Sequence, residues 1–169
     1  MSNRHHSIDE IYWKLFTKPA VFGDDVMLEC KFPERTCCHR FARRWLGGTD
    51  LRLLVMNGAS VYPLKYTESF RPESYSSKLT IHSLNATDVN VQYACTYGFV
   101  KDVKVLELTE EDFESYPSEP LEANITTSTE NMLLINISME DVFPKPNCTA
   151  SLDVSTFIQK KIEWKCSNC

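Results

Sequence analysis

The chain has 169 residues, 43% of them hydrophobic, which suffices for one large domain or for one full domain and part of another. Its 18 Lys and Arg against 23 Asp and Glu give a formal charge of −5. That balance excludes a global basic field for nucleic acid or an anionic membrane, so we expect protein partners.

Seven cysteines and four Asn-X-Ser/Thr sequons indicate an oxidising, secretory environment. No stretch reaches the roughly 18 apolar residues of a membrane span, and the N-terminus lacks a signal peptide's apolar run. We expect a mature extracellular portion of a secreted or cell-surface protein, with no membrane insertion within this chain and a flexible N-terminus over residues 1–9. The predicted N-glycosylation sites are Asn85, Asn124, Asn136 and Asn147.

In chain order, short alternating runs rich in β-branched and aromatic residues predict strands. A turn at Gly23–Asp25 precedes the first of them. Gly47-Gly48 and Asn57-Gly58 are hairpin signals, because these residues tolerate the positive φ of tight turns. Gly98 begins a further turn, at Gly98–Lys101. The predicted strands are Val26–Phe32, Phe41–Leu46, Arg52–Met56, Lys78–His82, Gln92–Tyr97 and Val103–Leu108.

Cys30 is followed by 14 residues and then Trp45, and 49 further residues precede Cys95. Tyr93 stands two residues before Cys95, at the end of the run from Leu84. This pattern resembles the immunoglobulin superfamily, most nearly a V-set domain over residues 10–108. The resemblance implies an all-β immunoglobulin-like sandwich, a Cys30–Cys95 disulfide under the Trp45 indole, and a tyrosine corner at Tyr93.

The resemblance also implies that Arg71, at the start of strand D, pairs with Asp88 in the core. Asp88 is seven residues before Cys95, one more than usual in the family, so we expect a one-residue bulge near Asn90 or Val91. Only 64 residues separate the cysteines, which predicts an abbreviated C″ and D region. The predicted last strand, Val103–Leu108, corresponds to strand G of the family and lacks its Phe-Gly-X-Gly motif, which favours a receptor or adhesion type over an antigen receptor.

An acidic segment with two prolines, residues 109–120, is predicted to be a linker. Residues 121–169 are expected to form a partial or diverged immunoglobulin-like domain. Strand-like runs occur at Met132–Ile137 and Phe157–Trp164, and Val142–Asn147 resembles a B–C turn.

The Cys30–Cys95 assignment leaves five cysteines, an odd number. Vicinal Cys37 and Cys38 rarely close on each other, so at least one is expected to seek another partner. Cys148 is predicted to pair with Cys166 or Cys169. The remaining thiol leaves a disulfide-linked dimer open, beside a non-covalent homodimer.

The sequence contains no recognisable catalytic motif. Cys166–Cys169 has the Cys-X-X-Cys spacing but follows a strand-like run, and Cys37-Cys38-His39 lacks a second ligand pair at zinc-finger spacing. His82 is expected to be an exposed sheet residue. We therefore expect a non-enzymatic protein with no cofactor and no metal.

The resemblance implies that one sheet meets a protein partner, the sheet of strands C (Phe41–Leu46), C′ (Arg52–Met56), F (Gln92–Tyr97) and G (Val103–Leu108). If Trp45, Tyr93 and Cys95 face inward, alternation turns their neighbours outward. The predicted contact residues are Arg44, Leu46, Arg52, Leu54 and Thr96, with Phe99, Val100 and Lys101 in the F–G turn.

The plain alternative is that Arg40, Arg43 and Arg44 only solubilise the sheet and that Phe99 packs on its own hairpin. A sialic-acid-binding lectin, in which Arg44 holds the carboxylate, and a soluble immune decoy are the other functions considered. The leading interpretation is a module that recognises another protein, as cell-surface immune receptors, ligands and adhesion molecules do.

Overall fold

The structure is a computed structural model that describes residues 10–38, 40–116, 122–127, 133–138, 142–144, 147–153 and 161–167. The chain divides into two compact units, Met1–Asp112 and Phe113–Cys169.

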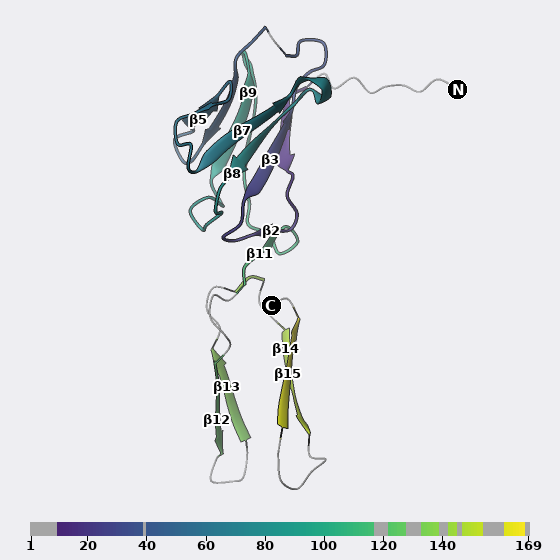
Figure 1. The fold of residues 1–169 in the computed structure, drawn as a ribbon, viewed down its shortest axis with the longest axis vertical. Coiled ribbons are helices and arrows are strands. Elements are labelled where there is room, and N and C mark those ends of the chain that lie inside the picture. Colours follow the sequence, from purple (N-terminus) through teal and green to yellow (C-terminus); the bar gives the residue numbers. More distant parts are fainter. Residues whose placement is uncertain are drawn as a thin grey trace, which may run out of the picture. The chain divides into compact units, whose positions relative to one another are not determined.

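The first unit contains two antiparallel sheets (Figure 1). The four-stranded sheet has the order β1 (Tyr12–Leu15), β3 (Val26–Lys31), β8 (Ser76–Ile81) and β7 (Tyr66–Arg71). The five-stranded sheet has the order β10 (Val100–Val105), β9 (Gln92–Tyr97), β4 (Arg43–Gly47), β5 (Arg52–Met56) and β6 (Ala59–Ser60). A two-residue strand β2 (Ala20–Val21) and a 3₁₀ turn η1 (Pro72–Ser74) complete the elements of this unit.

A disulfide and an indole occupy the centre of the core between the two sheets. Cys30 on β3 is bonded to Cys95 on β9, with their Cα atoms 6.3 Å apart. Trp45, on β4, is 1% exposed and stands opposite Cys95 in the register of β4 and β9. Its Nε1 donates to the Ser77 hydroxyl of β8 at 2.9 Å. Two sheets stapled in this way form an immunoglobulin-like β-sandwich.

A buried carboxylate extends this contact across the core. The Ser77 hydroxyl donates to Glu68 Oε1 of β7 at 2.5 Å, and the Glu68 side chain is 1% exposed. Its other oxygen accepts from the Gly58 amide at 2.6 Å, and Arg43 Nε lies 3.4 Å from Oε1. Because every polar atom of the carboxylate is partnered, Glu68 links strands of both sheets without an unpaired buried charge.

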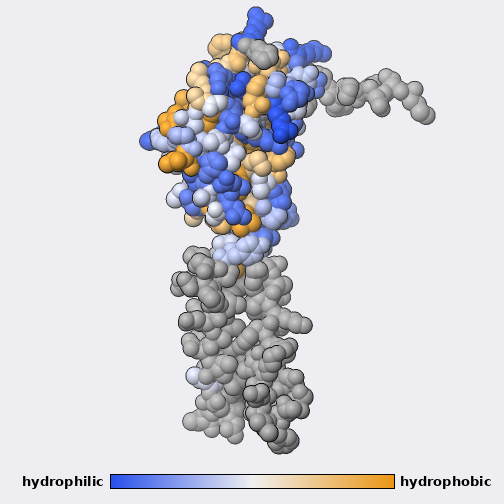
Figure 2. Space-filling model, in the orientation of Figure 1, coloured by the Kyte–Doolittle hydropathy of each residue, from blue (hydrophilic) through white to orange (hydrophobic). Residues whose placement is uncertain are grey.

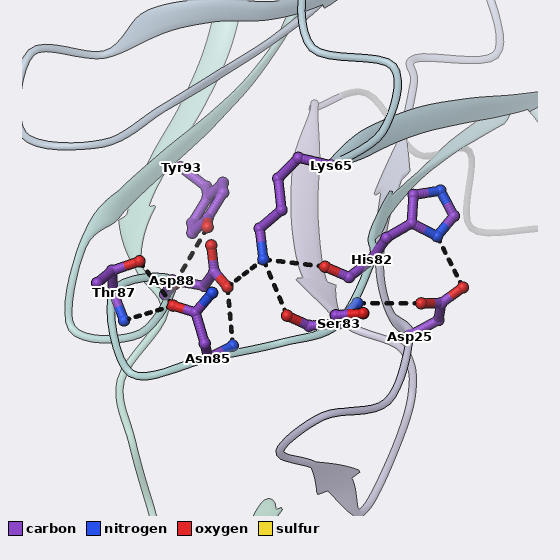
Figure 3. A network of polar contacts seen from close by, with 8 residues as sticks. All are labelled: Asp25, Lys65, His82, Ser83, Asn85, Thr87, Asp88 and Tyr93. Carbon is purple, nitrogen blue, oxygen red and sulfur yellow. Dashed lines mark hydrogen bonds and ion pairs between the residues drawn. The ribbon is translucent and has the colours of Figure 1, made fainter.

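The corner before β9 is held by Tyr93 and Asp88 (Figure 3). The Tyr93 hydroxyl donates to the Asp88 carbonyl at 3.1 Å, and burial raises the pKa of the Tyr93 phenol, which keeps it protonated. Asn90 has a φ of +57°, and its amide donates to the Leu106 carbonyl at 2.7 Å. The corner thus accommodates its additional residue by placing Asn90 in the left-handed conformation.

The partner predicted for Asp88 is wrong. Arg71 lies at the end of β7 and is exposed, whereas Lys65, just before β7, contacts Asp88 Oδ2 at 2.6 Å. Lys65 Nζ also donates to the His82 and Ser83 carbonyls at 2.9 and 3.0 Å (Figure 3). β7 runs from Tyr66 to Arg71, so only the residue before its first position reaches the corner.

His82 takes part in this corner as well (Figure 3). Its Nδ1 lies 2.7 Å from Asp25 Oδ2, and its Nε2 lies 3.0 Å from the Thr67 hydroxyl. The hydrogen bond from His82 lowers the pKa of the Asp25 carboxyl. His82 is therefore a half-buried, bonded side chain and not a free sheet residue.

Cys37 and Cys38 lie against each other with their Cα atoms 3.0 Å apart, and the pairing of at least one of them with another cysteine stays a prediction. One further prediction of the first unit needs correction. The last strand, β10, begins at Val100, three residues earlier than predicted, because the turn before it contains only Gly98 and Phe99.

The second unit contains a short strand and two antiparallel pairs (Figure 1). β12 (Glu122–Thr127) pairs with β13 (Leu133–Ser138), and β14 (Asn147–Asp153) pairs with β15 (Lys161–Ser167). β11 (Phe113–Glu114) lies within the segment predicted as a linker, and Ser115 forms a bridge with Phe143. Met132, residues 157–160 and Cys169 lie outside the described residues.

The ion pair between Lys65 and Asp88 should contribute to the stability of the first unit. Replacing Lys65 by Met leaves the 4%-exposed Asp88 carboxylate and two carbonyls without their cation, and we expect a loss of about 2 kcal/mol in the free energy of unfolding. Arg71→Met removes the same charge at an exposed position and should change it by less than about 0.5 kcal/mol. Urea unfolding measures both, and a larger loss for Arg71→Met would restore the predicted Arg71–Asp88 pair.

Candidate protein-binding face

The outward side of the five-stranded sheet follows from its register. Trp45, Cys95 and Tyr93 face the core, so the residues that alternate with them face away from it. Arg44 stands opposite Thr96, Leu46 opposite Ala94, and on β10 Lys101 and Val103 continue these two rows. The five-stranded face, as we call it, comprises Arg44, Leu46, Leu53, Met56, Ala94, Thr96, Lys101, Val103 and Val105.

Apolar side chains form most of this face. Met56 is 39% and Val105 41% exposed, and Leu46, Leu53 and Val103 are half-buried. Further exposed apolar residues follow β6, with Val61 at 50% and Leu64 at 94%. Figure 2 shows hydrophobic residues gathered at the edge of the first unit where Figure 1 labels β5. Apolar surface of this extent beside polar residues is typical of protein interaction sites.

Two cations lie on the face without a counterion. The side chains of Arg44 and Lys101 are exposed and make no hydrogen bond or ion pair with the described residues. None of the nine residues of the face is acidic. Such a face attracts a partner that presents carboxylates around an apolar centre.

Leu54 was predicted to face outward, and it does not. The pairing of β4 with β5 shifts between Trp45 and Leu46, which leaves Leu54 as an additional residue between Leu53 and Val55. Leu54 is 5% exposed and packs on Gly47, where an added Cβ would come within 2.7 Å of its Cδ1. The bulge therefore lets Leu53 and Met56 both face outward, whereas alternation from an outward Arg52 would turn Leu53 inward.

Arg52 and Val100 also lie off the face, although both are exposed. Arg52 stands opposite Gly47 and is paired with Asp50 at 3.1 Å. Val100 stands opposite Tyr97, in a row that faces the core at the edge of the sheet. Val103 and Val105 were missed because the strand that carries them was predicted to begin at Val103, with Lys101 and Val100 in a turn.

Thr96 lies on the outward side, where alternation predicts it, but its side chain is only 8% exposed. It lies on the central strand β9, between Arg44 of β4 and Lys101 of β10. Its hydroxyl is buried and has no hydrogen-bond partner among the described residues. The hydrogen-bonding capacity of this buried hydroxyl, which lies between two unpaired cations, is therefore unsatisfied within the face.

Phe99 stands at the tip of the β9–β10 hairpin and is 100% exposed. Gly98 precedes it with a φ of +61°, as a two-residue hairpin turn requires. Any side chain at Gly98 would meet Phe41 at 2.9 Å, and Phe41 itself rests edge-on against Tyr97. The Phe99 ring therefore does not pack on its own hairpin and is available at the end of the face.

The described residues contain no cluster of three or more His, Cys, Asp or Glu side chains that could hold a metal ion. Among the same residues, no helix has the length and apolarity that crossing a bilayer requires. In β15, Cys166 lies within a strand, so it lacks the helix N-terminus that activates a redox thiol.

No family model and no curated protein matches the chain. Among solved structures, the chain is similar to a chain of the crystal structure of Dpr11 IG1 bound to DIP-gamma IG+IG2. The identity is 16% and the TM-score 0.44, over 67% of this chain and 54% of that chain. The match thus spans little more than half of the other chain's length.

The unpaired hydroxyl yields a prediction. Thr96→Val keeps the shape of the side chain and removes the buried donor, so we expect the free energy of unfolding to rise by about 1 kcal/mol. Ser77→Ala removes a buried hydroxyl that serves both Trp45 and Glu68 and should lower it by about 2 kcal/mol. Urea unfolding of both variants measures the contrast; a Thr96→Val variant that loses stability would show that the hydroxyl has a partner.

Proposed function

We propose that the chain is an extracellular recognition module that binds another protein through the five-stranded face and the Phe99 tip. The observation that carries the proposal is an exposed, mainly apolar face with two unpaired cations and no acidic side chain. Apolar side chains such as Met56 and Val103 would supply the buried centre of the interface, and Phe99 a projecting aromatic anchor. Arg44 and Lys101 would orient an acidic partner.

We further propose that residues 10–108 form a V-set domain of the receptor or adhesion type. β5 and β6 extend the sheet of β10, β9 and β4 beyond the three strands of the constant type, which supports this assignment. The proposed location is the extracellular side of the plasma membrane or the secreted space, since disulfides persist there. A homodimer remains one arrangement of the same proposal.

For residues 121–169, after a linker at 109–120, we propose a minimal or diverged immunoglobulin-like domain. Its two antiparallel pairs and the cysteines on β14 and β15 support that proposal. The four sequons, of which Asn85 lies in an exposed loop, are the proposed glycan sites.

The second unit yields a disulfide prediction. Cys148 of β14 stands directly opposite Cys166 of β15, a position where Cβ atoms come close enough for a disulfide. Non-reducing peptide mapping should therefore show Cys148 linked to Cys166. A Cys148–Cys169 linkage would refute this pairing.

A binding screen tests the proposed function. The full chain, displayed as a multimer, is screened against a library of cell-surface proteins, and each hit is measured again with Val103→Asp. We expect at least a tenfold loss of affinity for Val103→Asp, since it places a charge in the apolar centre of the face. Ser69→Asp adds the same charge on the four-stranded sheet and should leave the affinity within twofold. Equal losses in both variants would refute the five-stranded face as the binding site.

A carbohydrate with a carboxylate is the second candidate. The arrangement that favours it is the pair of exposed cations Arg44 and Lys101, which flank Thr96 in one row and could both donate to one carboxylate. A glycan array separates the two functions: binding to sialylated glycans that is lost in Arg44→Ala would support a lectin, and an array without binding would reject it.

A further inference from the structure

The positive charge of the chain is concentrated in its first part. Residues 1–106 contain 14 Lys and Arg against 11 Asp and Glu, whereas residues 107–169 contain 4 against 12. Although the whole chain has a net charge of −5, the part that forms the sandwich, residues 1–106, has an excess of three cations. Four of these cations share the outward side of the four-stranded sheet, away from the five-stranded face.

The register of that sheet fixes their pattern. Neighbouring strands lie about 4.8 Å apart, so residues two strands apart in one row are separated by roughly 10 Å. One row holds Lys14 and Lys78 at this spacing between backbone positions. The adjacent row holds Lys31 and Arg71, each one strand further along the sheet. Across β1, β3, β8 and β7 the rows are Lys14, Glu29, Lys78, Ser69 and then Tyr12, Lys31, Ser76, Arg71.

Three of the cations share one carboxylate as their ion-pair partner. Glu29 lies beneath them with a side chain that is 9% exposed, and it is 3.8 Å from Lys14, 3.4 Å from Lys31 and 4.0 Å from Lys78. These distances are at the long end for ion pairs, and a single negative charge cannot neutralise three positive ones. Arg71 is exposed, and its guanidinium makes no hydrogen bond or ion pair with the described residues. The four cations and Glu29, which we call the lysine face, carry a net charge of +3.

The chemistry around these cations differs from that of a protein interface. Ser69, Ser76 and Thr80 place hydroxyls among them. The main apolar side chain beside them is Phe16, which is 44% exposed and has its ring centroid 3.2 Å from Lys78 Nζ. Lysine is depleted at protein interfaces, which depend on buried aromatic and apolar anchors. Figure 2 shows a mainly hydrophilic surface over β3, β7 and β8. A face with hydroxyls and rows of cationic residues around one carboxylate suits an extended polyanion whose sulfates accept hydrogen bonds.

We propose that the lysine face binds a sulfated polysaccharide of the glycosaminoglycan class. The chain of the polysaccharide lies across the four strands, with successive sulfates at Lys14 and Lys78 and at Lys31 and Arg71. Because the lysine face and the five-stranded face are opposite sides of one sandwich, both ligands bind together. The protein is then held in a sulfated matrix while its protein-binding face stays free.

The test uses the full chain and a size-defined heparin oligosaccharide immobilised on a sensor surface. The double variant Lys14→Gln and Arg71→Gln removes the two most exposed cations of the lysine face, and we expect its affinity to fall at least tenfold. The matched control is Arg44→Gln and Lys101→Gln, which removes two charges from the five-stranded face and should stay within twofold. Unfolding in urea verifies that both variants fold.

Several outcomes would overturn the proposal. Equal losses in the two double variants would show a response to net charge alone, and unchanged binding of desulfated heparin would show that sulfates are not recognised. Absence of heparin binding, or tighter binding to phosphatidylserine vesicles or polyglutamate at the same salt concentration, would assign the lysine face to another anion. Selective loss for sulfated heparin in the lysine-face variant supports the proposal, whatever protein the other face binds.

Discussion

The disulfide between Cys30 and Cys95, with Trp45 beside it, is the constraint on which the two binding faces depend. Closing a loop of this length stabilises the fold by about 4 kcal/mol in the chain-entropy account. It also fixes β3 and β9 face to face, so that inward and outward residues are set on both sheets. The hydrogen bonds from Trp45 through Ser77 to Glu68 then extend the constraint to β7 and to the turn at Gly58.

The outward sides of the two sheets differ in chemistry. On the five-stranded sheet, the bulge at Leu54 lets Leu53 and Met56 both face outward, which makes that side mainly apolar. On the four-stranded sheet, alternation turns Lys31 and Lys78 outward around Glu29. One sandwich thus presents a surface suited to a protein and, on its reverse, a surface suited to a polyanion.

Much of this fold could be predicted from local sequence. Gln92–Tyr97 and Arg52–Met56 were predicted with the bounds that the structure has, because alternating residues and hairpin signals mark both ends. The extra residue before Tyr93 also predicted an irregular corner, which Asn90 provides through its positive φ. Such features depend on residues close in sequence.

The errors concern contacts between distant residues. Nothing near Leu54 signals a bulge, because the shift arises from how β5 pairs with β4, and one additional residue reverses the side on which every later side chain lies. The choice of Lys65 over Arg71 depends on where β7 begins relative to the corner. Glu68 was missed because a carboxylate in an alternating strand looks like a solvent-facing residue until its partners Ser77 and Gly58 are known.

The central claim is that the register fixed by the disulfide turns Leu53 and Met56 outward and Leu54 and Val55 inward. Hydroxyl-radical footprinting of the folded chain, resolved to single residues, measures this directly. The account predicts strong labelling of Met56, clear labelling of Leu53, and protection of Leu54 and Val55. Strong labelling of Leu54 with protection of Leu53 would contradict it, because the sheet would then lack the bulge and present a different face.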